Sequence, residues 1–179
     1  MNWPAPRNLP WLLLISAAVF VADRLSKAWV VAHIPLTGAI PVIDHILRIS
    51  HWTNEGAAFS MFAGAASPRE VNHVLTAVNF LVASGVLVAL ARLGSRISLV
   101  TVALAFILGG AMGNVHDRLA YGAVIDFIEV HIFTYHWPDF NVADFSIVTG
   151  ACLIFLDSLL PRGRKRGSKG ARERADRHV

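Results

Sequence analysis

Four long apolar segments constrain the fold of this chain more than any other feature. They cover roughly residues 11–32, 68–93, 97–115 and 142–160. Each is close to the ~20 residues that an α-helix needs to cross the hydrocarbon core of a bilayer. The composition agrees, because 55% of the residues are hydrophobic and only 16% are charged, which is too apolar for an ordinary soluble domain. We therefore predict an all-α membrane protein with four transmembrane helices.

Local signals mark the helix ends. The run Ser67-Pro-Arg-Glu70 combines an N-cap serine, a proline at the first helical position and a glutamate at the third, which is a capping box. Gly94 is suited to end the helix that starts there. Gly109 and Gly113 are four positions apart and allow another helix to approach closely. We therefore expect the third helix to lie at the centre of the bundle.

The basic residues predict how the chain is oriented in the membrane. An even number of spans puts both termini on one side, and arginines and lysines crowd residues 162–179 and the short connection 92–96. The positive-inside rule places these segments in the cytoplasm and the connections 33–67 and 116–141 outside. Because the basic run follows a hydrophobic helix directly, we interpret it as a topology signal and expect no nucleic-acid partner.

These signals divide the chain into two parts. Residues 1–161 form a four-helix membrane domain, and residues 162–179 form a basic cytoplasmic tail that we expect to be disordered and able to contact anionic membrane lipid. Apolar and polar residues alternate from Ile46 to Trp52, which predicts a small extracytoplasmic β-sheet in the first outer connection.

Two aspartates lie in apolar sequence that reads as membrane-embedded. They are Asp126 in Val-Ile-Asp-Phe-Ile and Asp144 in Phe-Asn-Val-Ala-Asp-Phe. An ionisable side chain at membrane depth costs several kcal/mol, so it usually marks a function. If the two carboxyl groups share a proton, repulsion raises one pKa and leaves one base and one acid. Such a pair can activate water against an amide bond without a metal or a covalent intermediate.

Other polar residues accompany the two aspartates. Each also has a structural interpretation as an ion pair, a helix anchor or a helix cap. Asp117 is an alternative to Asp126 as the catalytic residue, and we favour Asp126 because Arg118 stands beside Asp117 and would keep it ionised. The accompanying candidates are Asp23, Lys27, Asn54, Gly56, Asn114, Asp117, Arg118 and Asn141.

Five blocks of residues together resemble the lipoprotein signal peptidases (signal peptidase II). The resemblance covers nearly the whole chain except the tail, and the blocks stand in the same order as in that family. They are Asp23-Arg-Leu-Ser-Lys27, Asn54-Glu-Gly-Ala-Ala-Phe59, Gly109-Gly-Ala-Met-Gly-Asn-Val-His-Asp-Arg118, Val124-Ile-Asp-Phe127 and Phe140-Asn-Val-Ala-Asp144.

The resemblance implies a function and a place in the cell. It implies an aspartic endopeptidase of the bacterial inner membrane that removes the signal peptide of diacylglyceryl-modified prolipoproteins, cutting just before the lipidated cysteine. It also implies inhibition by globomycin, no cofactor, and an active site toward the periplasmic face. The catalytic dyad of the family falls on Asp126 and Asp144, and the accompanying candidates form a polar shell, in which Asn54 and Arg118 are suited to hold substrate carbonyls. We expect the chain to act as a monomer.

Three residues depart from the family pattern. Arg24 stands where glutamine is common, His116 where an apolar or aromatic residue is usual, and Phe145 where serine commonly follows the second aspartate. None of the three replaces a catalytic group. Phe145 removes a hydroxyl next to Asp144, and this loss could raise the pKa of that aspartate.

Aromatic and histidine residues in the outer connections suggest further roles. Trp52, Phe59, Met61 and Phe62 could cover a bound peptide or anchor the loop at the interface, and both interpretations stay open. Several histidines face outward without the spacing typical of metal ligands, and the single cysteine excludes a cysteine metal site or a disulfide within the chain, so we expect no metal. These histidines are His33, His45, His51, His131 and His136.

Two other functions compete with a peptidase. A small ion-coupled transporter would use intramembrane charges as a relay, but the charges gather at one side and no inverted repeat is visible. A noncatalytic scaffold would use the polar residues only to hold helices together, and it would tolerate Asp126→Asn and Asp144→Asn.

Overall fold

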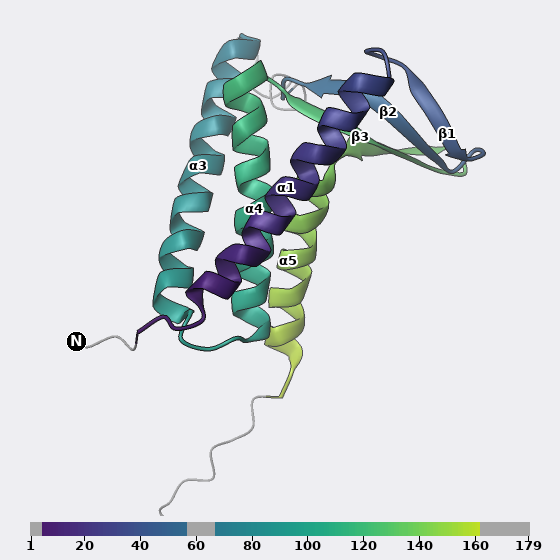
Figure 1. Cartoon of the computed structure of the whole chain (residues 1–179). Helices are drawn as coiled ribbons and strands as arrows, with labels where there is room; N and C mark the ends of the chain where they lie inside the picture. Colours follow the sequence, from purple (N-terminus) through teal and green to yellow (C-terminus); the bar gives the residue numbers. More distant parts are fainter. Residues whose placement is uncertain (1–4, 57–66, 162–179) are drawn as a thin grey trace, which may run out of the picture.

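The computed structural model describes residues 5–56 and 67–161. Four helices and four strands follow one another along these two stretches, and Figure 1 shows the strands gathered at one end of the helical bundle. In chain order the elements are α1 (Leu9–His33), β1 (Ala39–Ile43), β2 (Leu47–Asn54), α3 (Pro68–Leu93), α4 (Leu99–Tyr121), β3 (Val124–Ile132), β4 (Tyr135–Phe140) and α5 (Val142–Leu159).

All four helices are long and apolar enough to cross a membrane, so the predicted four-span architecture is confirmed. The main difference is at the third span, where α4 continues to Tyr121 instead of ending at Val115. Asp117 and Arg118 are therefore helical residues, and they lie where α4 meets the sheet. The predicted tail, residues 162–179, and the loop residues Phe59, Met61 and Phe62 lie outside the described residues.

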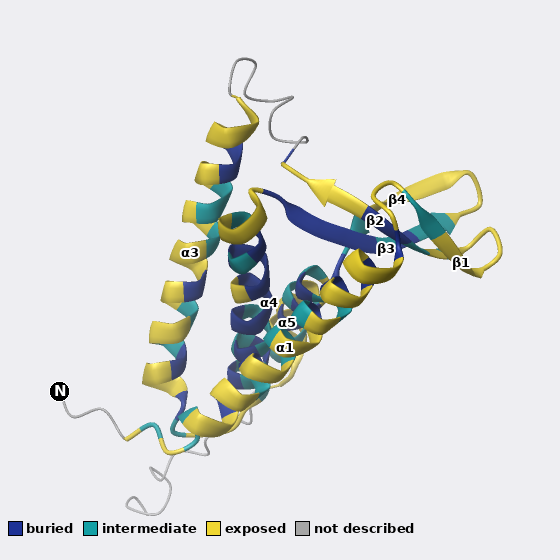
Figure 2. Cartoon of the chain, turned by 45° about the horizontal axis from the view of Figure 1, so that its top comes forward, coloured by how far each residue is buried: buried dark blue, intermediate teal, exposed yellow. Residues whose placement is uncertain are grey.

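The helix α4 is the centre of the bundle, as its glycines predict. It packs against α1, α3 and α5, and Figure 2 shows it as the most buried helix. A Cβ added at Gly109 would lie 2.6 Å from the Ser16 carbonyl oxygen of α1, and one added at Gly113 would lie 2.6 Å from the Asp23 Oδ2. Because glycine has no Cβ, α1 and α4 pack closely at this point.

Hydrogen bonds fix the helix ends. The predicted capping box of α3 is present, with Ser67 accepting from the Glu70 backbone N–H and the Glu70 side chain accepting from the Ser67 N–H. Gly94 ends the same helix and donates its N–H to the Leu90 carbonyl. A second capping box, between Asn141 and Asp144, starts α5. These caps satisfy backbone groups that a helix end otherwise leaves without partners.

The sheet is larger than the sequence predicts. It is antiparallel in the order β1-β2-β3-β4, so the second outer connection supplies half of it. In the register of β2 with β3, Trp52 pairs with Asp126. Asp126 therefore lies on a sheet strand at the end of the bundle and not on one of the four candidate spans. The apolar residues around it are buried, which is typical of a core strand, and Figure 2 shows much of β3 as buried.

Candidate active site

A buried ion network connects α1 to α4. The Lys27 ammonium lies 2.8 Å from Asp23 Oδ2 and 2.7 Å from Asp117 Oδ2, and all three side chains are fully buried. Arg24 forms a further ion pair with Asp117. Two carboxylates thus face two cations, which is the condition under which buried charges are tolerated.

The same network positions the strand and helix that carry the catalytic candidates. Asp23 Oδ1 accepts a hydrogen bond from the Ala143 backbone N–H of α5 at 3.0 Å. Asp117 Oδ2 accepts one from the Ile125 N–H of β3 at 3.3 Å. Asp23 and Asp117 therefore hold the backbone immediately before Asp144 and Asp126, and both are engaged in structure.

Asp126 is the buried member of the pair. Its side chain lies on β3 with only 3% of the residue exposed. Oδ2 accepts a hydrogen bond from Asn54 Nδ2 at 3.0 Å, and Oδ1 accepts one from Asn141 Nδ2 at 2.8 Å. Burial, and after it the charge of Asp144, raises the pKa of Asp126 to about 7, although the two asparagine hydrogen bonds act in the opposite direction.

Asp144 is the more accessible member and lies in the first turn of α5. Its Oδ1 accepts a hydrogen bond from Asn114 Nδ2 of α4 at 2.8 Å, and its Oδ2 accepts one from the Asn141 N–H at 3.3 Å. Its own N–H donates to Asn141 Oδ1 at 2.9 Å. Both oxygens of the Asp144 carboxyl group therefore have hydrogen-bond donors. Phe145 is 62% exposed, and the two bonds to Asp144 do not need a hydroxyl at that position.

Asn54 and Gly56 complete the side of the site formed by β2. Asn54 Oδ1 accepts a hydrogen bond from the Gly56 N–H at 2.8 Å. Gly56 has a φ of 89°, and an added Cβ would lie 2.6 Å from Leu75 Cδ1 of α3. The positive φ favours glycine at this position, and the tight turn aims the Asn54 amide at Asp126.

Arg118 lies between the aspartates and a cavity. Its guanidinium interacts electrostatically with Asp126 and Asp144, while its Nη1 donates to Asn72 Oδ1 at 3.2 Å. Its Nε is buried and has no hydrogen-bond partner among the described residues. It lines a cavity of about 650 Å³ between the ends of α3 and α4, together with Glu55, Asn72 and His73. Arg118 also interacts electrostatically with Asp117, beside which the sequence interpretation places it.

A second hollow lies beside Asp144. It measures about 280 Å³ and is lined by Trp137, Phe140, Asp144, Phe145 and Val148. Apart from the carboxyl group, these side chains are aromatic or aliphatic. One catalytic candidate therefore lies next to a surface suited to an apolar group.

The structure brings together every site residue that the sequence proposes, and it adds two. Arg24 was noted only as a departure from the family pattern, yet it pairs with Asp117. Asn72 was not considered, and it holds Arg118 from α3. The helix α3 carries other polar residues around Asn72 and a second asparagine, Asn79, so no sequence signal singles out Asn72. Trp52, from the proposed peptide cover, is 42% exposed on β2.

The fold and the site define a four-span membrane protein with two interacting carboxyl groups, held by asparagines, where the bundle meets a small sheet. The model of the signal peptidase (SPase) II family matches residues 15–160. This chain belongs to that family, and it is a peptidase by class.

Relatives and solved structures agree with the assignment. The lipoprotein signal peptidase of Xanthomonas campestris pv. campestris is 41% identical over 92% of this chain and 98% of its own length. That of Shewanella halifaxensis is 36% identical over 96% and 98%. A solved structure described as a bacterial membrane enzyme superposes with a TM-score of 0.75 at 27% identity, over 86% of this chain and 95% of that one.

Proposed function

We propose that this chain is an aspartic endopeptidase that removes signal peptides from diacylglyceryl-modified prolipoproteins and cuts before the lipidated cysteine. The observation that carries the proposal is the pair Asp126 and Asp144, whose environments differ in the way an acid and a base require. Asp126 is buried with its pKa raised to about 7, and Asp144 is capped by hydrogen-bond donors at a helix N-terminus.

The difference assigns the two roles. Asp144 is the base and takes a proton from water as the water oxygen attacks the scissile carbonyl carbon. Asp126 is the acid and gives its proton to the carbonyl oxygen, which produces a neutral tetrahedral diol. The proton then held by Asp144 passes to the amide nitrogen while the carbon–nitrogen bond breaks, and a diol hydroxyl returns its proton to Asp126. No metal or covalent intermediate is required.

The remaining polar groups position the substrate. Arg118 keeps donors that the described residues do not use, and its planar guanidinium suits a peptide carbonyl. Asn54 uses one amide hydrogen on Asp126 and keeps a second for the substrate. The apolar hollow beside Asp144 accommodates an acyl chain of the lipidated cysteine. The lipid is then bound next to the aspartate that activates water at the scissile bond.

The proposed orientation follows from the ends of the bundle. The start of α1 and the connection from α3 to α4 lie together at one end, where the Asn8 N–H donates to the Gly94 carbonyl, and the sheet lies at the other end (Figure 1). With the basic connection 92–96 in the cytoplasm of an inner membrane, both termini are cytoplasmic and the aspartates face the periplasm. The proposed enzyme acts as a monomer.

A gel-shift assay tests the proposal. A purified diacylglyceryl-modified prolipoprotein is incubated with wild-type protein, Asp126→Asn, Asp144→Asn or the control Asp44→Asn, which changes an exposed turn residue. We expect cleavage by wild type and Asp44→Asn only, blocked by globomycin, with all variants folded. If Asp126→Asn still cleaves the substrate, Asp117 would replace Asp126 as the proposed catalytic residue. No cleavage by folded wild type would contradict the proposal and favour the transporter.

A further inference from the structure

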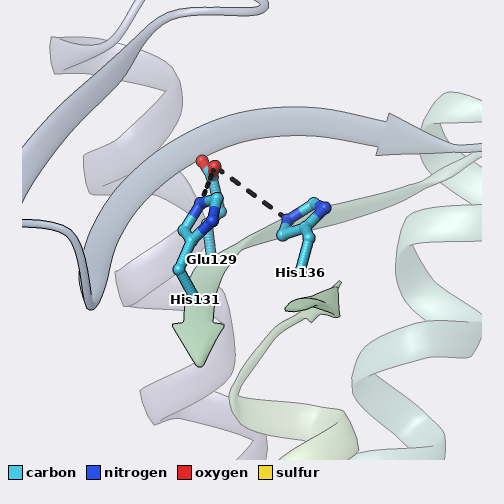
Figure 3. A group of neighbouring side chains, drawn as sticks. All are labelled: Glu129, His131 and His136. Carbon is cyan, nitrogen blue, oxygen red and sulfur yellow. Dashed lines mark hydrogen bonds and ion pairs between the residues drawn. The ribbon is translucent and has the colours of Figure 1, made fainter. Parts of the chain in front are cut away.

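The β3–β4 hairpin brings together three side chains that are metal ligands in many proteins. Glu129 and His131 lie two residues apart on β3, and His136 lies on β4 directly opposite His131 in the register. One ligand atom from each of the three lies within 4.8 Å of the others, and Figure 3 shows the two rings beside the Glu129 carboxylate. Spacing along one element does not reveal this cluster, because the pairing of two strands creates it.

The separations are close to those of a tetrahedral zinc site. Glu129 Oε1 lies 2.7 Å from His131 Nε2 and 3.9 Å from His136 Nε2. Ligands bound to zinc at about 2.0–2.1 Å are roughly 3.3 Å from one another in a tetrahedron. The observed distances lie on either side of that value, so small rotations of exposed side chains reach it. Both imidazole rings are partly exposed and accessible to an ion from solvent.

A fourth oxygen is nearby. Asp139 Oδ1 lies 3.1 Å from His136 Nε2. The pairing of β3 with β4 is irregular here, because Val130 pairs with Trp137 whereas Ile128 pairs with Phe140. The extra residue of β4 at this bulge re-aims the side chains that follow Trp137, and it leaves Asp139 next to the cluster.

We propose that Glu129, His131 and His136 bind a Zn²⁺ ion, with Asp139 as the neighbouring carboxylate. Two imidazoles and a carboxylate are a ligand set that zinc uses in proteins. The ion connects β3 to β4 and so clamps the hairpin that carries Asp126 and leads into Asn141. It is separate from the catalytic pair, because Glu129 lies three residues beyond Asp126 on an extended strand, roughly 10 Å along it and on the opposite face.

Arg48 is the competitor for this site. Its Nη1 lies 3.3 Å from Glu129 Oε1, and its side chain is 45% exposed. Without a metal, the cluster is a hydrogen-bonded network in which the Glu129 carboxylate binds the side chains of Arg48 and His131. A bound cation repels the Arg48 guanidinium, and the exposed side chain can move into solvent. Removing the Arg48 charge should therefore strengthen zinc binding. If the three side chains only form a hydrogen-bonded network and bind no metal, the Arg48 substitution would not change zinc affinity.

Isothermal titration with ZnCl₂ tests the inference on the full chain, purified without a histidine tag. We expect one ion per chain for wild type and for His33→Ala, a control on α1 that lies outside the cluster. The double variant His131→Gln/His136→Gln keeps side-chain hydrogen bonding, and we expect its affinity to fall at least tenfold. Arg48→Gln should bind more tightly than wild type.

The thermal transition supplies a second measurement. Zinc should raise the transition temperature of wild type and His33→Ala but not that of the double variant, because only a ligand that binds the folded state stabilises it. Equal zinc affinity in wild type and the folded double variant would overturn the inference, and so would the absence of binding to wild type. Neither result depends on peptidase activity, so the two proposals fail independently.

Discussion

Asn141 donates a hydrogen bond from Nδ2 to Asp126 Oδ1 at 2.8 Å. The same residue accepts the Asp144 N–H on Oδ1 at 2.9 Å and donates its backbone N–H to the Asp144 carboxylate at 3.3 Å. A single buried asparagine thus caps α5 and connects the two aspartates. Among these contacts, Asn141 is the residue that reaches both the proposed acid and the proposed base.

Asn141→Ala should reduce cleavage more than it reduces stability. Loss of the cap costs about 1 kcal/mol of stability, while loss of the amide removes one of the two side-chain hydrogen bonds to Asp126, a bond that lowers the pKa of that aspartate. The control is Ser67→Ala, which removes the equivalent cap from α3 without touching either aspartate. We expect Asn141→Ala to lower the thermal transition more than Ser67→Ala, because the lost amide also leaves the buried Ile125 carbonyl and Asp126 without a donor, and we expect a large loss of cleavage rate only in Asn141→Ala. Equal cleavage rates would contradict the bridging role.

Cleavage should fall as pH rises through about 7. The proposed acid, Asp126, has its pKa raised to about 7, so it loses its proton in this range. Because the two aspartates interact, the pH at which the rate falls reports a pKa of the pair and not of Asp126 alone. A rate profile between pH 5 and 9 tests this. In Asn141→Ala the residual activity should decline at a higher pH than in wild type. A rate that rises through pH 7 would reverse the assignment of acid and base.

The same shift makes stability depend on pH. Between the ordinary pKa of 3.8 and about 7 the folded state holds a proton on Asp126 that the unfolded state has lost. Stability attributable to this group therefore falls as pH rises through that window. Asp126→Asn should gain transition temperature relative to wild type at pH 8 and lose the advantage near pH 4, whereas Asp44→Asn should show no such trend.

Lys27→Met should destabilise the protein by roughly 3–5 kcal/mol, because it leaves Asp23 and Asp117 buried with one cation fewer. Arg48→Met is the matched control. It breaks a partly exposed pair with Glu129, which is worth about 0–1 kcal/mol. Denaturation in detergent compares the two. Similar losses of stability would mean that the buried network does not hold α1 to α4.

Gly110→Ala should impair both stability and cleavage. An added Cβ would collide with the Ala143 carbonyl oxygen of α5, and overpacking of this kind costs about 1–3 kcal/mol. Separation of the two helices would also move Asn114 away from Asp144. Gly85→Ala is the control, since an added Cβ there meets no atom within 4 Å. Thermal transitions and cleavage rates measure both effects, and equal behaviour of the two variants would contradict the close packing.

Removal of metal ions with EDTA should leave the cleavage rate unchanged, because the aspartate pair activates water without a metal. The proposed zinc clamp lies apart from the pair, so its loss should lower the thermal transition and not the turnover of folded protein. The gel-shift assay is repeated with EDTA and then with added Zn²⁺. Activity lost with the chelator and restored by zinc would overturn the metal-free mechanism.

Much of the fold could be predicted from local patterns. The length and apolarity of the four segments specify the spans, since a helix must satisfy its own backbone within a bilayer. The capping box at Ser67 and the glycines of α4 depend on neighbours within one or two turns, and the structure has them as predicted. The strands β3 and β4 were missed for different reasons. The first half of β3 is a short apolar run without clear alternation, which periodicity alone does not assign to a strand, and β4 contains Pro138, which argues against a strand.

The sequence by itself determined the four spans, the helix caps and the residues of the candidate site, because these follow from hydrophobicity, local hydrogen bonding and ordered motifs. Only the tertiary structure decided which polar groups meet. Lys27 bridges Asp23 and Asp117, Arg118 turns to Asn72, and two strands bring His136 to Glu129. The physical reason is that a side chain's partner depends on how separate elements pack, and a spacing along one helix or strand cannot specify it.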